Sequence, residues 1–252
     1  MIEFEDRGKI TLLRMARGKG NALNIEFLEA IVGALDRLEG NPARAGIVTG
    51  QGSVFGAGVD LPALVEGGPE YVRRFLPLLE RVFERFATFP KPLVAAVNGH
   101  AIAGGAIIML ACDQRLLARG SARIGLTEVR VGVMFPSWAL EIARFSTPPE
   151  HFRTLICTGR TWEPEDALSR GLVDELTEPE RLLDRARELA EELAAIPQPA
   201  FTTTKLAVRR PLIEAARQQA RLTGEAVVQH WCAPETLHCI ATFAEQAIKR
   251  RG

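Results

Sequence analysis

The chain has 252 residues, of which 47% are hydrophobic and 25% charged, and its 31 basic side chains balance 31 acidic ones. This length suits one large domain, or a main domain with a smaller appendage, and the composition is typical of a globular protein. Because the net charge is zero, the sequence predicts neither nucleic acid nor an anionic membrane surface as a partner.

No part of the sequence is typical of a targeting signal, a membrane span or a metal site. The start at Met1 lacks a basic region followed by an apolar core, and the longest apolar run, 101–112, contains glycines and is followed by an aspartate. The four histidines show no ligand spacing, and the four cysteines form no CxxC pair. We therefore expect a cytoplasmic protein without metal, whose cysteines are buried free thiols. These are Cys112, Cys157, Cys232 and Cys239.

The first half of the chain alternates short strands with helices. Two strands are expected at 2–5 and 9–15, joined by a turn at Arg7-Gly8. Asn24 is expected to cap a helix that ends at Gly40-Asn41-Pro42. The following elements are expected as strand 45–49, a glycine-rich turn at 50–58, helix 70–87, strand 93–97, helix 107–111, strand 114–118 and a short strand near 123–124.

After about Ser137 the strand signal nearly vanishes and helical runs dominate. Helices are expected at 149–157, 164–169, 180–195, 200–215 and 236–250. This order predicts an α/β core with a helical appendage. A dinucleotide-binding doubly wound domain is the weaker α/β alternative, because the glycine-rich turns do not match GxGxxG.

Two glycine-rich turns each follow an apolar strand. In one, Gly104-Gly105 stands at the start of an apolar helix, where backbone N–H groups are unpaired at the positive end of the helix dipole. The other turn covers 55–60. Two backbone donors from two separate turns are what a developing enolate oxygen needs.

Several linked motifs spread over nearly the whole chain resemble the crotonase (enoyl-CoA hydratase/isomerase) superfamily. They are Asn21-Ala22-Leu23-Asn24, 55–60, 91–99, Gly104-Gly105, Cys112-Asp113, 124–128 with Gly132, Thr158-Gly159-Arg160 and 171–174. The resemblance implies a spiral core of β-β-α units over 1–195 and a C-terminal helical trimerisation region over 196–252. It also implies homotrimers or dimers of trimers that bind acyl-coenzyme A thioesters, with coenzyme A entering as part of the substrate and no other cofactor.

The resemblance also implies an arrangement of catalytic groups. The backbone N–H groups of Val59 and Gly104 would hold the thioester oxygen. Hydratases of the family carry two glutamates, and this sequence has Ile107 at the first of these positions and Glu128 at the second. Adding water calls for one group to activate the water and another to manage the proton, whereas a single carboxylate can move a proton between two carbons. We therefore expect isomerisation of an enoyl-CoA double bond through a dienolate, as in the enoyl-CoA Δ3-Δ2 isomerase branch, which the segment 124–128 with Gly132 and Pro136 most resembles.

Two other functions remain open: hydration or another crotonase reaction such as thioester hydrolysis or decarboxylation, and acyl-CoA binding without turnover.

Glu141 would supply a second carboxylate only if its helix turned into the pocket. His100 is expected to be structural, Asp60 to cap a helix or turn, and Asp113 to end a helix or pair locally. The candidate substrate contacts are Lys19, Ala22, Ala57, Gly58, Asp60, Gly105, Ile107, Phe135, Trp138, Phe243 and Lys249.

Overall fold

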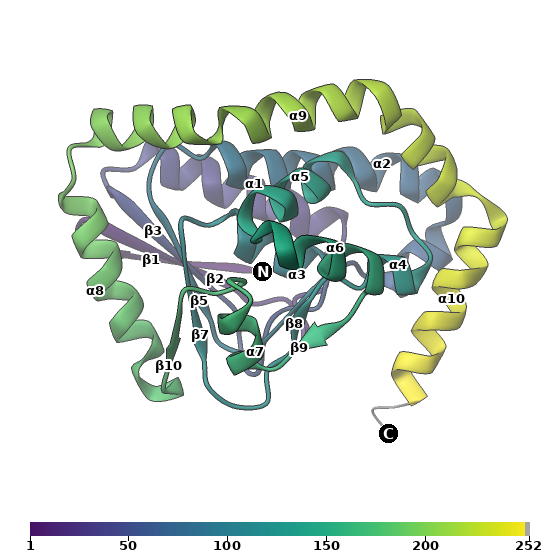
Figure 1. The fold of residues 1–252 in the computed structure, drawn as a ribbon, viewed down its shortest axis with the longest axis horizontal. Helices are drawn as coiled ribbons and strands as arrows, with labels where there is room; N and C mark the ends of the chain where they lie inside the picture. The colour runs from purple at the N-terminus through teal and green to yellow at the C-terminus, as the bar shows by residue number, and fades with distance from the viewer. Residues whose placement is uncertain (250–252) are drawn as a thin grey trace.

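Two β-sheets form the centre of the computed structural model, which describes residues 1–249 (Figure 1). The larger sheet has the order β1 (Ile2–Arg7), β2 (Ile10–Met15), β3 (Ala45–Thr49), β5 (Leu93–Val97), β7 (Gln114–Ala118) and β10 (Glu175–Thr177). The smaller sheet has the order β4 (Val54–Gly56), β6 (His100–Ile102), β8 (Ile124–Gly125) and β9 (Thr161–Trp162). Only the β1–β2 and β8–β9 pairs are antiparallel.

The chain repeats one unit three times. Each unit places a strand in the larger sheet, then a short strand in the smaller sheet, then a helix: β3-β4-α2, β5-β6-α3 and β7-β8-α4. This is the expected spiral of β-β-α units. The helices are α1 (Ile25–Gly40), α2 (Leu61–Thr88), α3 (Gly104–Ala111), α4 (Glu128–Val131), α5 (Ser137–Ser146), α6 (Pro149–Thr158), α7 (Pro164–Ser169), a 3₁₀ turn (Pro179–Arg181), α8 (Leu182–Ala195), α9 (Gln198–Cys232) and α10 (Pro234–Lys249).

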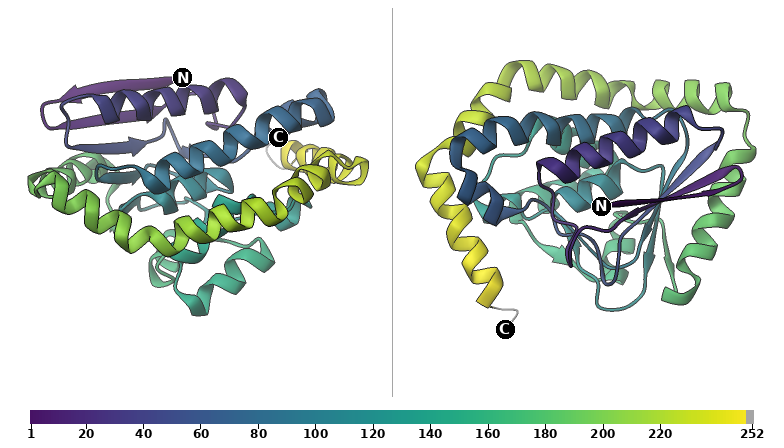
Figure 2. Two further views of the ribbon diagram at one scale, coloured as in Figure 1. Left: turned by 90° about the horizontal axis from the view of Figure 1, so that it is seen from above. Right: turned by 180° about the vertical axis from the view of Figure 1, so that it is seen from behind.

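The larger sheet packs against helices on both faces, which explains why β5 at its centre consists of five buried apolar residues. Successive side chains of a strand point to opposite faces, so Val94 and Ala96 pack toward α8 while Ala95 and Val97 join the main core. In α8 the buried alanines Ala186, Ala190 and Ala194 recur every four residues and form the face that meets the sheet. On the opposite side, α1, α2 and α9 lie next to one another (Figure 2).

The predicted strands at 45–49, 93–97 and 114–118 are confirmed at those bounds. The cap at Asn24 is confirmed as well, since its side-chain oxygen accepts a 3.0 Å hydrogen bond from the backbone N–H of Phe27. Asp60 caps α2 in the same way and accepts a hydrogen bond from Ala63 at 3.3 Å. Capping side chains of this kind satisfy N–H groups that a helix leaves unpaired at its start.

Several expected elements differ from the structure. The link from β5 to α3 is not a simple turn, because His100–Ile102 forms β6, and the very short strands β9 and β10 carry too little alternation to be predicted. Helix α2 starts earlier than expected and kinks at Gly68, whose φ is +59°. The predicted helix 200–215, which already includes Pro211, continues beyond residue 215 to Cys232, because tertiary packing outweighs local propensity.

The cysteine prediction is confirmed for free thiols but wrong for burial. All four cysteines are free, yet of these Cys112 alone is buried, while Cys157 and Cys239 are exposed. Among the described residues, no helix combines the length and apolar character needed to cross a membrane, and no group of three or more potential ligands is placed to hold a metal ion.

A buried ion cluster fastens α9 to the core. Asp113, expected to end a helix or to pair locally, follows directly on the C-cap of α3, but its ion pairs are not local. Its two oxygens accept hydrogen bonds from Lys205 Nζ at 2.7 Å and Arg209 Nη2 at 2.9 Å, both more than ninety residues along the chain. The same carboxylate accepts the backbone N–H of Leu93 at 2.8 Å. Burial lowers the pKa of Lys205 to about 8.

We expect the substitution Asp113→Ala to lower the free energy of unfolding by about 3–5 kcal/mol, because it leaves two buried cations without their partner. Urea unfolding would measure the loss. Asp184→Ala, which removes an exposed partner of Arg181, is the matched control and should cost less than about 1 kcal/mol. Equal effects of the two substitutions would contradict the role of Asp113.

Candidate active site

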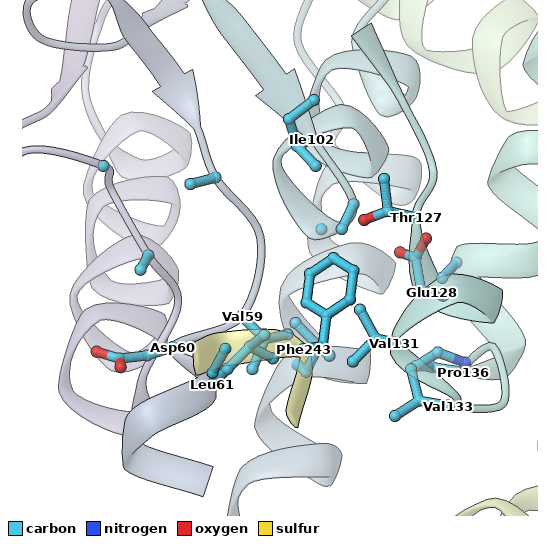
Figure 3. A pocket seen from close by; sticks show the side chains of 18 of the residues that line it. Val59, Asp60, Leu61, Ile102, Thr127, Glu128, Val131, Val133, Pro136 and Phe243 are labelled. Carbon is cyan, nitrogen blue, oxygen red and sulfur yellow. The ribbon is translucent and has the colours of Figure 1, made fainter. Parts of the chain in front are cut away.

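A pocket of about 630 Å³ opens beside the smaller sheet (Figure 3), and its lining residues fall into two groups that differ in burial. The partly exposed group comes from loops and from β6: Gly20, Ala22, Ala57, Val59, Asp60, His100, Ile102 and Ala103. Buried apolar residues from α2, α4, α5 and α9, with their connections, form the other: Leu79, Phe83, Val131, Val133, Ala139 and Trp231. Phe243 and Ala244 of α10 complete the wall.

The backbone around Val59 is held so that its N–H stays unpaired. Leu23 pairs with Val59 as a parallel bridge, in which Leu23 N–H donates to the Gly58 carbonyl at 2.7 Å and Asp60 N–H donates to the Leu23 carbonyl at 2.9 Å. In such a bridge the N–H of the central residue points away from the partner strand. Within residues 1–249, no group accepts a hydrogen bond from the Val59 N–H.

The second unpaired donor is Gly104, the first residue of α3. The helix ladder begins with Ile107 N–H donating to the Ala103 carbonyl at 3.0 Å, so the N–H groups before it have no partner in the helix. Ala103 itself has φ +49° and ψ −125°, a strained conformation for a residue with a Cβ. Strain of this kind persists where the surroundings enforce it, and it recurs at functional sites.

Glycines let the two turns touch. A Cβ on Gly58, whose φ is +84°, would lie 2.8 Å from the Ala103 Cβ and 3.6 Å from the Gly104 nitrogen. A Cβ on Gly105 would lie 2.3 Å from the Gly56 carbonyl oxygen. Gly58 and Gly105 therefore do not line the pocket; they bring together the two backbone segments that do.

Glu128 begins α4 and places a buried carboxyl in the pocket, on the side opposite Val59, Asp60 and Leu61 (Figure 3). Its side chain is buried, and within the described residues its Oε2 atom has no hydrogen-bond partner. Burial raises the pKa of Glu128 to about 7. A carboxyl with this pKa exchanges a proton readily near neutral pH.

No other carboxyl of the described residues that line this pocket is unengaged. Asp60 pairs with Arg17 at 2.9 Å and caps α2, and Glu141 turns to Arg144, whose Nε lies 3.1 Å from its Oε2. Glu141 does not line the pocket, so it supplies no second carboxylate there. Ile107 is fully buried outside the lining.

Sequence reasoning missed a buried carboxyl that supports the pocket wall from behind. Glu80 of α2 accepts hydrogen bonds from the backbone N–H groups of Ser137 at 2.7 Å and Trp138 at 3.0 Å, the first residues of α5. Burial raises the pKa of Glu80 to about 7. Ser137 and Trp138 lie 57 and 58 positions after Glu80 in the sequence, and no local pattern connects them with it. The capping role of Glu80 was therefore not predicted.

The other predicted contacts fall into two groups. Ala22, Ala57, Asp60 and Phe243 line the pocket together with Val59, Gly104 and Glu128. Lys19 is exposed and outside the lining, and Phe135 and Trp138 pack next to the pocket without lining it. The side chain of Lys249 lies outside the described residues. His100 has the expected structural role, since its Nδ1 accepts the backbone N–H of Arg123 at 3.0 Å, but it also lines the pocket.

The raised pKa of Glu128 predicts a pH dependence of stability. A carboxyl whose pKa rises from 4.5 in the unfolded chain to about 7 on folding holds its proton more tightly in the folded state, so it contributes stability at low pH that is lost as the pH rises between these values. In the wild-type protein this effect lowers the free energy of unfolding as the pH rises from about 5 to about 8. We expect this decrease to be smaller in Glu128→Gln, by up to about 3 kcal/mol. Denaturant unfolding at several pH values measures this, with exposed Glu66→Gln as the control. An unchanged pH dependence in the Glu128→Gln variant would contradict the burial argument.

The pocket combines unpaired backbone donors with a buried carboxyl, and sequence comparison shows its class: the chain belongs to the enoyl-CoA hydratase/isomerase family, whose model matches residues 5–247. A putative enoyl-CoA hydratase of Thermus thermophilus is 40% identical over 69% of this chain and 70% of its own. The mitochondrial enoyl-CoA delta isomerase 1 of Rattus norvegicus is 26% identical over 83% of this chain and 74% of its own.

Solved structures confirm the fold. The human mitochondrial Δ3-Δ2-enoyl-CoA isomerase superposes with a TM-score of 0.94 over 100% of this chain and 99% of its own, at 24% identity. A probable enoyl-CoA hydratase of Mycobacterium tuberculosis superposes with a TM-score of 0.84 over 90% of this chain and 97% of its own, at 30% identity. The names of the relatives include both hydratases and isomerases, so the choice between the two reactions depends on the site.

Proposed function

We propose that this enzyme isomerises a β,γ-unsaturated acyl-CoA to the α,β-unsaturated thioester, with Glu128 as its single base. The observation that carries the proposal is the count of available carboxyls: among the described residues lining the pocket, Glu128 is the one not held by an ion pair or cap. Hydration would need a second group to manage the proton. Ile107, buried outside the lining, supplies none.

The proposed reaction has two proton transfers. Glu128 removes a proton from the α-carbon, and the electron pair moves onto the thioester oxygen, forming a dienolate. The N–H groups of Val59 and Gly104 donate to this oxygen and stabilise its charge most strongly when the charge has developed. The protonated Glu128 then returns the proton to the γ-carbon, which leaves the double bond between the α- and β-carbons.

The surroundings of Glu128 favour return of the same proton. Val131 and Val133, both buried and apolar, line the pocket on the side of Glu128, where the partly exposed hydroxyl of Thr127 is the polar group beside the carboxyl (Figure 3). The same apolar setting keeps the pKa of Glu128 near neutrality, so its ionised form can act as a base.

Turnover assays separate this proposal from its alternatives. An isomerase converts a 3-enoyl-CoA to the 2-enoyl-CoA, and it gives little 3-hydroxyacyl-CoA from crotonyl-CoA in water. Rapid formation of 3-hydroxyacyl-CoA would instead establish a hydratase, the function named for the Thermus relative. An acyl-CoA-binding protein without turnover would bind the thioester but exchange no α-proton with deuterated water.

Homotrimeric or hexameric assembly through the helical region 196–252 is also proposed here. Val208 and Leu222 of α9 support it, because 59% and 71% of their surfaces are exposed. Analytical ultracentrifugation would measure the assembly, and a monomer at assay concentration would refute it.

The division at residue 195, the cytoplasmic location and the absence of any cofactor besides substrate coenzyme A stay predictions.

A further inference from the structure

Trp231 belongs to the buried part of the pocket lining, where no sequence motif placed a functional residue. It belongs to the last turn of α9, it is 2% exposed, and it lines the pocket. The other members of the buried apolar group in the lining are all hydrocarbon side chains: Leu79, Phe83, Val131, Val133 and Ala139. An acyl chain entering past Val59 and Gly104 would extend toward Trp231 and these residues, whose one polar side-chain group, the indole N–H of Trp231, already donates to the Met134 carbonyl.

The indole ring is held in a fixed position. Its Nε1–H donates to the Met134 carbonyl at 2.8 Å, and the neighbouring His230 has its Nε2 atom 3.0 Å from the Gly132 carbonyl. Both carbonyls belong to the segment 132–134, which leads out of α4 and contributes Val133 to the pocket wall. A ring fixed by a hydrogen bond at one edge cannot swing aside at low cost to admit a longer chain.

The same hydrogen bonds connect α9 with the helix that carries the base. The N–H groups of Gly132 and Val133 both donate to the backbone carbonyl of Glu128, each at 3.1 Å. Segment 132–134 therefore contacts Glu128 on one side and Trp231 on the other. α9 is in turn fastened to the core by the ion cluster of Asp113 with Lys205 and Arg209.

We propose that Trp231 is a specificity-determining residue, whose ring closes the buried apolar part of the pocket and sets the longest unbranched hydrocarbon acyl chain that the site accepts. This inference rests on the proposed function only in that the ligand is an acyl-CoA thioester. The reaction performed on that thioester does not enter the argument.

The test measures chain-length dependence in two variants that differ in what they remove. Trp231→Leu removes the ring and keeps the site apolar, whereas Trp231→Phe keeps an aromatic ring and removes the N–H donor. Trp138→Leu is the matched control, because Trp138 is also a buried tryptophan near the pocket but does not line it. Each protein is titrated calorimetrically with saturated acyl-CoAs of increasing length, and kcat/KM is measured for 3-enoyl-CoAs of the same lengths.

We expect Trp231→Leu to shift the optimum to longer chains and to raise kcat/KM for the longest substrates, relative to the shortest, by about tenfold or more. Trp231→Phe should keep a chain-length limit closer to that of the wild-type protein than Trp231→Leu does. Its kcat should be lower than that of the wild-type protein, because the segment 132–134 next to Glu128 loses a hydrogen bond. Trp138→Leu should leave the length profile of the wild-type protein unchanged.

Two results would overturn the inference: a Trp231→Leu profile identical to that of the wild-type protein, or a shift of equal size in Trp138→Leu. The binding series separates this failure from failure of the proposed function. A length limit in acyl-CoA binding that moves in Trp231→Leu supports the inference even where the wild-type protein hydrates its substrate instead of isomerising it.

Discussion

Replacing Glu128 by glutamine is expected to lower kcat for isomerisation by about 10²–10⁴-fold, because a glutamine side chain cannot accept the α-proton. The volume and shape of the side chain are kept, so acyl-CoA affinity should change little. In the wild-type enzyme, kcat/KM should rise with pH through about 7, as the carboxyl whose pKa burial has raised becomes ionised. Steady-state kinetics with a 3-enoyl-CoA measures both effects.

Glu141→Gln is the matched control for this experiment. Glu141 is as buried as Glu128, at 8% exposure each, but it pairs with Arg144 and does not line the pocket. Its substitution should leave kcat within a few-fold of the wild-type value. Near-full activity in Glu128→Gln, or an equal loss in Glu141→Gln, would show that the base has been assigned to the wrong residue.

Removing the backbone donor at Val59 should have the next largest effect. The substitution Val59→Pro deletes an N–H that no group within the described residues accepts, so no structural hydrogen bond is lost with it. We expect kcat to fall by about 10²–10³-fold, the typical loss of one donor to a developing oxyanion. Kinetics and α-proton exchange into deuterated water should fall together, since both pass through the same dienolate.

Val59→Ala is the control, because it shortens the side chain and keeps the N–H; its activity should stay within a few-fold of the wild-type enzyme. Gly58→Ala tests the same donor in a second way. Its new Cβ would lie 2.8 Å from the Ala103 Cβ, so the turn that carries the Val59 N–H would have to move. This variant keeps the test open where the proline variant does not fold, as judged by circular dichroism. Full activity in a folded Val59→Pro or Gly58→Ala enzyme would refute the donor role.

Much of the fold could be predicted because its inner strands are buried on both faces. Segment 93–97 is therefore apolar throughout and segment 45–49 is apolar up to Thr49, and an apolar run of this length between turn signals favours a strand. Strands of two or three residues, such as β6 and β9, carry no such signal. They exist because neighbouring strands pair with them, which is information that a local sequence window does not contain.

The residues of the candidate site also divide into those that a local sequence pattern identifies and those that it does not. Val59, Gly104 and Glu128 occupy glycine-rich or strand-end motifs, so the resemblance located them, and the structure places all three around one pocket. Their roles stay predictions. Trp231 and Glu80 were missed because each acts through contacts far along the chain: Trp231 with Met134, 97 residues away, and Glu80 with α5, 57 residues away.

The extension of α9 to Cys232 explains the first of these omissions. Its buried residues Ala216, Val227 and Trp231 face the core, but the mixed polar and apolar sequence after residue 215 hides their periodicity. A helix expected to stop at residue 215 could not deliver a tryptophan to the pocket. Long-range pairs such as Asp113 with Lys205 decide where this helix lies, and such pairs follow only from the folded chain.

The most direct test of a single shuttling base uses a 3-enoyl-CoA that carries deuterium on the α-carbon. If Glu128 takes the label and returns it within an apolar pocket, a substantial part of the deuterium should appear on the γ-carbon of the 2-enoyl-CoA product, as seen by NMR or mass spectrometry. A product whose γ-carbon carries only solvent hydrogen, or the appearance of 3-hydroxyacyl-CoA as the main product, would contradict the account.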